Sequence, residues 1–390
     1  MKQVFLIDNL LYILSVFLLF NCVFDPAGLL FRVKDLLFVL IVLIYCVYVG
    51  KTSKCKKAFF NYLLVFAFIL PFVSIVFYCL FHLPNGVNYD ISSVKTYIFL
   101  SFSLVLYNLK RDVIVPFCKI LTLLSIVIIV IYILADLIPG FIEVVNIFGK
   151  QYELGKIVIK QLGSYQNTRI YFWTSPLIVF ACVHYFSKYF FLHKKIYLLL
   201  TCINVVGLFM SGSRMNMGIS ILVVPFLYWY YSSLRKRMLI YCALLLLFMI
   251  FFPLVYDFLV NNIITESDRS DQVRDVLLSD YMLLFSDPII LLFGQGVGSM
   301  FSQSRGLELS YSELTYIELY RRFGLILGSV YVFLLLYPLR NIFRYFRKYD
   351  SHIYIAFLIY LLMATFNPFL FSSSGMIILS IVLCNYFAKK

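Results

Sequence analysis

Long windows without a charged side chain cover most of this chain, and they constrain its fold more than any other feature of the sequence. A transmembrane helix needs about 20 consecutive, predominantly apolar residues. The windows are 9–24, 36–50, 58–89, 96–109, 120–135, 170–187, 196–213, 215–234, 238–256, 323–339 and 351–388. The last window is long enough for two helices that turn near Asn367-Pro368 and residues 372–375. We therefore predict an all-α polytopic membrane protein, a single integral domain over residues 1–390 with about twelve transmembrane helices.

The composition excludes an ordinary soluble domain. Of the residues, 63% are hydrophobic and 13% are charged, whereas about 25% charged residues are usual in soluble domains. The net charge of +14 would suit a nucleic-acid-binding protein, but the basic residues stand in short clusters between apolar windows, which is a signal of membrane topology. We therefore expect no nucleic-acid partner. No small-residue cleavage pattern follows the first apolar run, so Phe5 to Val23 is expected to be a retained span.

The basic clusters predict the orientation. They lie on the cytoplasmic side if both chain termini do, as the positive-inside rule requires. The clusters are Lys51 to Lys57, Lys110-Arg111, Lys188 to Lys195, Arg235 to Arg237, Arg340 to Lys348 and Lys389-Lys390. This orientation leaves two long segments outside, residues 138–169 and residues 257–323.

The second outer segment, residues 257–323, is the one long polar interval of the chain. It holds ten of the 19 acidic residues. We predict an amphipathic helix at the membrane surface from Arg269 to Phe285, ended by Asp287-Pro288. A set of three aspartates, Asp268, Asp271 and Asp275, could bind a divalent cation, although a solvated helix face is the commoner use of such a set.

Arg214 follows Ser211-Gly212-Ser213 between two apolar windows, so it lies in a tight outer hairpin or in one interrupted helix. A guanidinium at membrane depth is costly unless it faces a partner or a wet cavity. A phosphate bound through two hydrogen bonds at the headgroup level is a natural ligand for it. An interfacial anchor or an ion pair within the protein is the alternative interpretation.

Two further motifs in the outer loop could contact a ligand. Gly294, Gly296 and Gly298 alternate, which would allow close backbone approach and exposed amides that hold an anion, although a re-entrant turn explains the pattern equally well. Glu313 stands just before the next span, where partial desolvation would raise its pKa and suit it to accept a proton from a sugar hydroxyl. As the alternative, Ser310 to Glu313 fits a helix capping box.

The cysteines and histidines predict no metal or redox centre. The nine cysteines lie within or beside apolar windows and are interpreted as small core residues. Zinc, dinucleotide and serine-hydrolase signatures are absent from the sequence. We therefore predict no cofactor and no metal ligand set.

The order of these features resembles the O-antigen polymerase (Wzy) and O-antigen ligase superfamily. The similarity covers roughly residues 165–375 and consists of four motifs in sequence. They are Ser211-Gly212-Ser213-Arg214 after a span, a long outer loop with an Arg-rich helix, Asp287-Pro288 leading to the glycine run, and Glu313-Leu314-Thr315-Tyr316-Ile317-Glu318-Leu319 closing at Phe323-Gly324-Leu325-Ile326. The resemblance implies a membrane-embedded glycosyltransferase of the C type (GT-C) in the bacterial inner membrane, with a periplasmic active site.

That resemblance also implies a reaction and its partners. A growing glycan would pass from undecaprenyl pyrophosphate to a hydroxyl of an incoming undecaprenyl-pyrophosphate-linked repeat unit, with inversion at the anomeric carbon. Arg214 would stabilise the leaving pyrophosphate, and Glu313 would orient or deprotonate the acceptor. Substrate binding would use Arg169, Arg269, Arg274, Arg305, Gly294, Gly296, Gly298, Glu318 and Arg322. Membrane lipids, a chain-length regulator and a flippase are the further partners implied.

Two alternatives stay open on the sequence. Ligases of the superfamily carry a His-Asn pair where this chain has Glu313-Leu314, and this departure favours the polymerase over an O-antigen ligase that transfers glycan to lipid A-core. A lipid-linked oligosaccharide flippase or secondary transporter would also have about twelve spans, but it would favour charges near the bilayer midplane and two related halves. Here the charges gather in one asymmetric outer loop.

Overall fold

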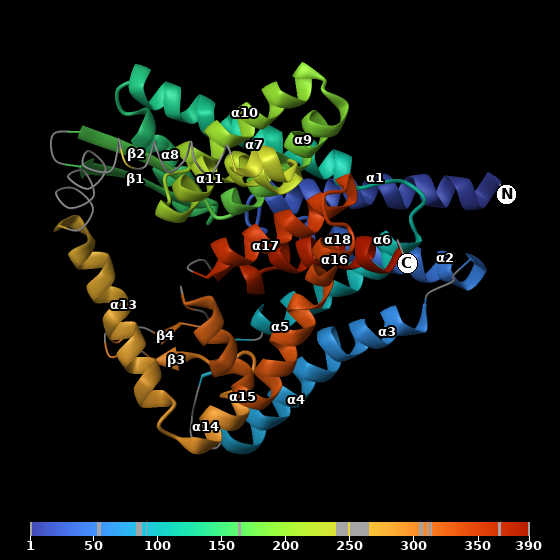
Figure 1. Cartoon of the computed structure of the whole chain (residues 1–390). Helices are drawn as coiled ribbons and strands as arrows, with labels where there is room; N and C mark the ends of the chain where they lie inside the picture. The colour runs from blue at the N-terminus through green and yellow to red at the C-terminus, as the bar shows by residue number, and fades with distance from the viewer. Residues whose placement is uncertain are drawn as a thin grey trace.

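The computed structural model describes residues 2–52, 56–82, 88–90, 92–162, 165–238, 249, 265–302, 304, 306, 308–309, 312, 314–365 and 368–388. Within these ranges the chain is almost entirely helical (Figure 1). Five helices are long and apolar enough to cross a membrane, namely Leu6–Phe24, Lys57–Phe81, Ile114–Leu137, Ser175–Leu192 and Thr315–Arg344. Three shorter apolar helices accompany them, Lys195–Met210, Tyr349–Ala364 and Ser373–Ala388. The helical membrane-protein class predicted from the apolar windows is therefore supported.

The predicted windows correspond closely to helices in the N-terminal half. These helices are α1 (Lys2–Phe24), α2 (Lys34–Thr52), α3 (Lys57–Leu63), α4 (Leu70–Phe77), α5 (Ser92–Ile98), α6 (Phe102–Asn108), α7 (Ile114–Leu137) and α8 (Phe141–Gln151). The π-helical segment Leu64–Ile69 joins α3 to α4, and a second π-helical segment, Tyr78–His82, extends α4. The 3₁₀ segment Phe99–Ser101 joins α5 to α6. The window 238–256 lies outside the described residues except for Met249.

The C-terminal half follows the windows in the same way. Its helices are α9 (Ile178–Leu192), α10 (Lys195–Met210), α11 (Arg214–Tyr231), α13 (Thr265–Leu284), α14 (Pro288–Phe293), α15 (Thr315–Leu336), α16 (Arg340–Arg344), α17 (His352–Ala364) and α18 (Ser373–Ala388). Short 3₁₀ segments stand at Ser175–Leu177, Tyr337–Leu339, Tyr349–Ser351 and Pro368–Phe371. The long last window does divide into two helices, α17 and α18, and the surface helix predicted for Arg269 to Phe285 is confirmed as a helix, α13.

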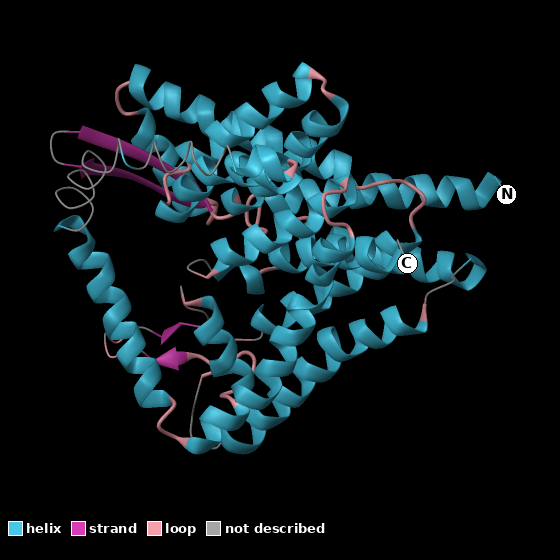
Figure 2. Ribbon diagram, viewed as in Figure 1, coloured by secondary structure: helices cyan, strands magenta, loops and turns pink. Residues whose placement is uncertain are grey.

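The first segment predicted to lie outside, residues 138–169, adds a short strand pair to the helical architecture. Strands β1 (Gly155–Leu162) and β2 (Tyr165–Phe172) pair antiparallel, with Gly155 opposite Phe172 and Leu162 opposite Tyr165 (Figure 2). The window 170–187 therefore begins in a strand rather than in a helix. The physical reason is local, because β1 contains the consecutive β-branched residues Ile157, Val158 and Ile159, a residue type that favours strands. A second, minimal pair joins β3 (Phe301–Ser302) to β4 (Glu308–Leu309).

Polar side chains join helices within the apolar body. Asn204 on α10 donates to Thr122 Oγ1 (3.0 Å) and accepts from Ser125 Oγ (2.9 Å), both on α7. One turn further on, Gly207 lets the two helices approach closely, because a Cβ there would lie 2.6 Å from the Ser125 Cβ. Small residues with interhelical hydrogen bonds are the usual means of packing helices in a bilayer.

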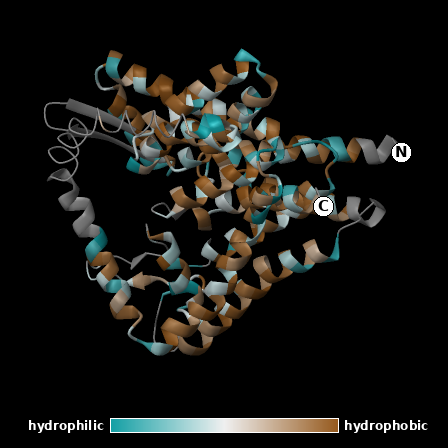
Figure 3. Ribbon diagram, viewed as in Figure 1, coloured by the Kyte–Doolittle hydropathy of each residue, from teal (hydrophilic) through white to brown (hydrophobic). Residues whose placement is uncertain are grey.

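The two outer segments lie at the same end of the molecule. In Figure 1 the β1–β2 hairpin and the start of α13 stand at one end, and both chain termini stand at the other. The hydropathy colouring shows apolar residues along most of the helices between these ends (Figure 3). The side of a membrane that each end faces stays a prediction from the basic clusters.

Candidate functional site

Helix α15 is broken at Gly324, and the break organises the most polar part of the interior. Gly324 has φ 65° and ψ −178°, so the residues before and after it form two separate helical pieces. The break leaves backbone carbonyls without their helical hydrogen-bond partners, and groups from other segments donate to them instead. Gln295 N donates to Arg321 O (2.6 Å), Gly296 N donates to Arg322 O (3.1 Å), and Ser74 Oγ donates to Arg322 O (2.7 Å). A break within a bilayer is tolerated only where the protein satisfies the backbone in this way.

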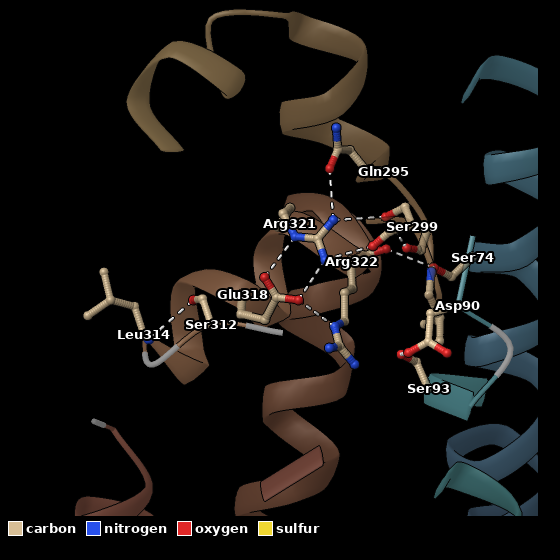
Figure 4. Close-up of polar contacts among 12 residues, drawn as sticks. Ser74, Asp90, Ser93, Gln295, Ser299, Ser312, Leu314, Glu318, Arg321 and Arg322 are labelled. Carbon is tan, nitrogen blue, oxygen red and sulfur yellow. Dashed lines mark hydrogen bonds and ion pairs between the residues drawn. The ribbon is translucent and has the colours of Figure 1, made fainter. Parts of the chain in front are cut away.

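The piece of α15 before the break carries a buried charge network (Figure 4). Arg321 Nη2 lies 2.7 Å from Glu318 Oε1, and Arg322 Nε lies 2.7 Å from the same oxygen. All three side chains are at most 2% exposed. The spacing of three and four residues places them on one helix face, which is why a single carboxylate can contact both guanidiniums.

Arg321 is fully satisfied by hydrogen bonds. Besides two bonds to Glu318, its guanidinium donates to Gln295 Oε1 (2.8 Å), Ser299 Oγ (2.9 Å) and Ser299 O (3.1 Å). These five bonds equal the number of N–H groups of a guanidinium. Because Gln295 and Ser299 belong to the loop after α14, Arg321 fastens that loop to the head of α15.

Arg322 differs from Arg321 in what surrounds it. Its guanidinium lies 5.1 Å above the centre of the Phe371 ring, in addition to its bond to Glu318. Since Glu318 is the acid in both ion pairs, the three charged residues of the network sum to one positive charge. Burial of that charge is costly and requires a close set of partners, which the carboxylate and the aromatic ring supply.

Tyr281 joins α13 to the same network. Its hydroxyl donates to Glu318 Oε2 (2.8 Å) and shares a hydrogen bond with Ser312 Oγ (2.6 Å). Burial raises the pKa of Tyr281 above its ordinary value, and the adjacent Glu318 carboxylate raises it further. The Tyr281 ring stacks on Phe301 with centroids 4.7 Å apart. The outer helix α13 is thus held to α15 by a protonated tyrosine and a small aromatic cluster.

The glycine run does not present the exposed amides that we expected. Gly294 N donates to Ile290 O (2.8 Å) and Gly296 N donates to Arg322 O. All three glycines, Gly294, Gly296 and Gly298, have φ between 81° and 95°, a region that favours glycine. A Cβ on Gly294 would meet the backbone of Arg322 and Gly324, and one on Gly296 would meet Tyr78. Gly294 therefore allows close packing against the break in α15, whereas Gly296 packs against Ser74 and Tyr78, and Gly298 against Tyr89.

The capping-box interpretation of Ser310 to Glu313 falls partly outside the described residues, which include neither Ser310 nor Glu313. Helix α15 begins at Thr315, and its N-cap Leu314 makes no side-chain capping bond. Ser312 instead accepts from Leu314 N (3.3 Å) and is bound to Tyr281. Glu313 itself lies outside the described residues.

Arg214 lies apart from this network. It is exposed at the first position of α11, and Ser213 caps that helix by accepting from Asn216 N (3.1 Å). Asn216 is buried and donates to Ser175 Oγ (3.0 Å) and to Ser211 Oγ (2.7 Å). Of the two predicted alternatives for residues 211–214, a hairpin fits, because α10 ends at Met210, α11 starts at Arg214 and the two helices pack against each other. Arg214 therefore stands on a rigid, hydrogen-bonded corner.

The remaining predicted site residues are only partly described. Arg305 lies outside the described residues, and the side chains of Arg169 on β2 and Arg269 on α13 do so too. Arg274 is half-buried on α13. Glu318 and Arg322, predicted to bind substrate, lie in the buried network. Sequence reasoning assigned no role to Arg321, Gln295, Ser299, Tyr281 or Ser74, although Glu318-x-x-Arg321-Arg322 has the spacing of ion-paired residues on one helix face.

Comparison with known proteins assigns neither a family nor a function to this chain. No protein-family model, no curated protein and no solved structure matches this chain. Among the described residues, no group of three or more His, Cys, Asp or Glu side chains is placed to hold a metal ion.

Proposed function

We propose that this protein is a polysaccharide polymerase of the O-antigen polymerase type, a membrane glycosyltransferase with about twelve spans and a GT-C fold. It transfers a growing glycan from undecaprenyl pyrophosphate to an incoming undecaprenyl-pyrophosphate-linked repeat unit at the periplasmic face. The order of the four motifs between Ser211 and Ile326 is the basis of the proposal. An O-antigen ligase is the alternative within the same superfamily.

One structural observation supports it most. The network of Glu318, Arg321 and Tyr281 fastens α13 and the loop after α14 to the head of α15. The polar interval is therefore folded around a rigid centre, as a site that must orient two large substrates requires. In this proposal Glu318, Arg321 and Arg322 position the loop, whereas Arg214, Glu313 and the other loop arginines contact the substrates.

The chemistry of the proposal is electrostatic. As the anomeric bond breaks, negative charge develops on the departing pyrophosphate, and a guanidinium that binds it better at that moment lowers the barrier. Arg214 is exposed on a fixed helix end, where the helix dipole also favours an anion. Glu313 accepts the proton of the attacking hydroxyl, and the oxygen–anomeric carbon bond forms as the bond to pyrophosphate breaks.

A test uses the purified protein in proteoliposomes with undecaprenyl-pyrophosphate-linked repeat units. Wild type should convert them into a ladder of longer glycans. Arg214→Ala should reduce the rate by at least about 100-fold, the usual loss when one transition-state donor is removed. Arg235→Ala is the matched control, because Arg235 is exposed just beyond the opposite end of α11. A ladder of normal length and rate from Arg214→Ala would remove Arg214 from the mechanism.

A second candidate, a lipid-linked oligosaccharide flippase or secondary transporter, is favoured by the break in α15. Discontinuous helices with charged groups beside the break are a feature of transporter substrate sites. The same proteoliposomes separate the two functions. A flippase moves the substrate across the bilayer without lengthening it, whereas a polymerase lengthens the glycan.

A further inference from the structure

Helix α8 presents three distinct sectors around its circumference. Val144, Ile147 and Phe148 share one face by their helical spacing, and they are 65%, 66% and 43% exposed. On the opposite side Gly149 is buried, and Ile142 and Val145 pack against the apolar core. Glu143 and Lys150 are exposed two helical turns apart, along one edge of the apolar face. A helix surrounded by water alone would not present this apolar sector.

The preceding span, α7, also carries an exposed apolar stripe. Along α7 the residues Leu123, Ile126, Val130, Ile133 and Leu137 are all exposed. Their spacing alternates between three and four residues, so they form one continuous stripe on the outside of a helix long and apolar enough to cross a membrane. The chain then turns at Pro139-Gly140, where Gly140 has φ 79°, and α8 begins.

The geometry points to the bilayer as the partner of this surface: we propose that α8 lies in the interface of the outer leaflet. Val144, Ile147 and Phe148 enter the boundary between headgroups and acyl chains, about 5–10 Å deep. Lys150 and Glu143, along the edge, remain at the level of the headgroups and water, where a lysine side chain reaches lipid phosphates. This assignment depends on the membrane class of the protein and, for the choice of leaflet, on the orientation predicted from the basic clusters. It is independent of the proposed polymerase function.

The consequence concerns the first outer segment. Leu154 N donates to Gly149 O (2.9 Å) and Trp173 N donates to Leu154 O (3.1 Å), so the ends of the β1–β2 hairpin are tied to α8. Insertion of α8 in the interface therefore fixes the height of the hairpin above the membrane. The hairpin stands beside the headgroups rather than extending freely into the periplasm.

Tryptophan fluorescence tests the placement. The chain has two tryptophans, so wild type measured in parallel supplies the background. Three variants are reconstituted in vesicles of phosphatidylethanolamine and phosphatidylglycerol, with or without brominated acyl chains. They are Ile147→Trp, Val144→Trp and the matched control Glu143→Trp. For Ile147→Trp and Val144→Trp we expect quenching by brominated lipid at least about twice that of Glu143→Trp, and the reverse order with aqueous iodide.

The opposite order overturns the proposal. If the added tryptophans at 144 and 147 were quenched by iodide and not by brominated lipid, this face would be exposed to water in the isolated protein. Its partner would then be another protein and not the bilayer. Phe148→Trp exchanges one aromatic residue for another and provides a second probe of the same sector, should a larger substitution prevent folding.

Discussion

At the scale of single residues, Glu318 has the largest predicted effect on stability. It neutralises two buried guanidiniums and also accepts from Tyr281, so Glu318→Gln leaves Arg321 and Arg322 as buried charges without an anion. Breaking a buried ion pair from one side costs about 3–5 kcal/mol. We expect a matching fall in the free energy of unfolding of the detergent-solubilised protein, measured by denaturant titration.

Two companion variants separate charge from hydrogen bonding. Tyr281→Phe removes one hydroxyl and should cost about 1–3 kcal/mol, because the carboxylate loses one of its donors. Glu143→Gln, on the exposed edge of α8, should leave stability unchanged. If Glu318→Gln were as stable as Glu143→Gln, the buried network would not hold the loop in place.

At the scale of elements, the contact between α7 and α10 depends on one polar side chain and one glycine. Asn204→Ala removes both interhelical hydrogen bonds, a loss of about 1–2 kcal/mol in a membrane helix pair. Thr201→Ala is the matched control one turn earlier, because Thr201 Oγ1 donates only within its own helix, to Tyr197 O (2.8 Å). Gly207→Ala should cost at least as much as Asn204→Ala, since its Cβ would overlap Ser125.

Unfolding of the purified variants in mixed micelles gives the comparison. The expected order of destabilisation is Gly207→Ala and Asn204→Ala first, then Thr201→Ala. Equal values for Asn204→Ala and Thr201→Ala would show that the bonds to Thr122 and Ser125 contribute nothing between the helices.

Helices were predictable from the sequence wherever one apolar window encloses one element. The bounds of α10 and α11 follow the windows on either side of Arg214 to within a few residues, because the charge and the Ser-Gly-Ser turn cannot lie inside a span. The β1–β2 hairpin was missed, since the apolar residues of β2 run without a charge into those of α9. A short apolar run such as Ile157 to Ile159 does not by itself distinguish a strand from a helix.

Only the residue types of the candidate site were predictable from the sequence. The acids, arginines and glycines of the polar interval are evident in the sequence, but the packing of the glycine run against α15 depends on Gly324. That glycine lies at the edge of an apolar window, and its left-handed conformation breaks α15 and exposes the carbonyls of Arg321 and Arg322 to the glycine run. Without knowledge of that break, Gly294 and Gly296 resemble an anion-binding loop, and Ser310 to Glu313 resembles a helix cap.

At the scale of the whole molecule, the separation of the outer segments from the termini makes the orientation testable. Basic clusters predict that Lys195 and Arg235 face the cytoplasm, whereas Lys150 and Ser286 lie in the two outer segments; all four are exposed. A membrane-impermeant maleimide is added to spheroplasts that carry one of four variants with a single added cysteine, namely Lys150→Cys, Ser286→Cys, Lys195→Cys or Arg235→Cys. Labelling of the wild type gives the background from the native cysteines. Residues 150 and 286 should react in intact spheroplasts, and residues 195 and 235 only after the membrane is disrupted. Labelling of both residue 150 and residue 195 in intact spheroplasts would contradict the predicted orientation. The hairpin, α13 and the polar network could then not share the side opposite the basic clusters, so a periplasmic site on α13 and α15 would be excluded as well.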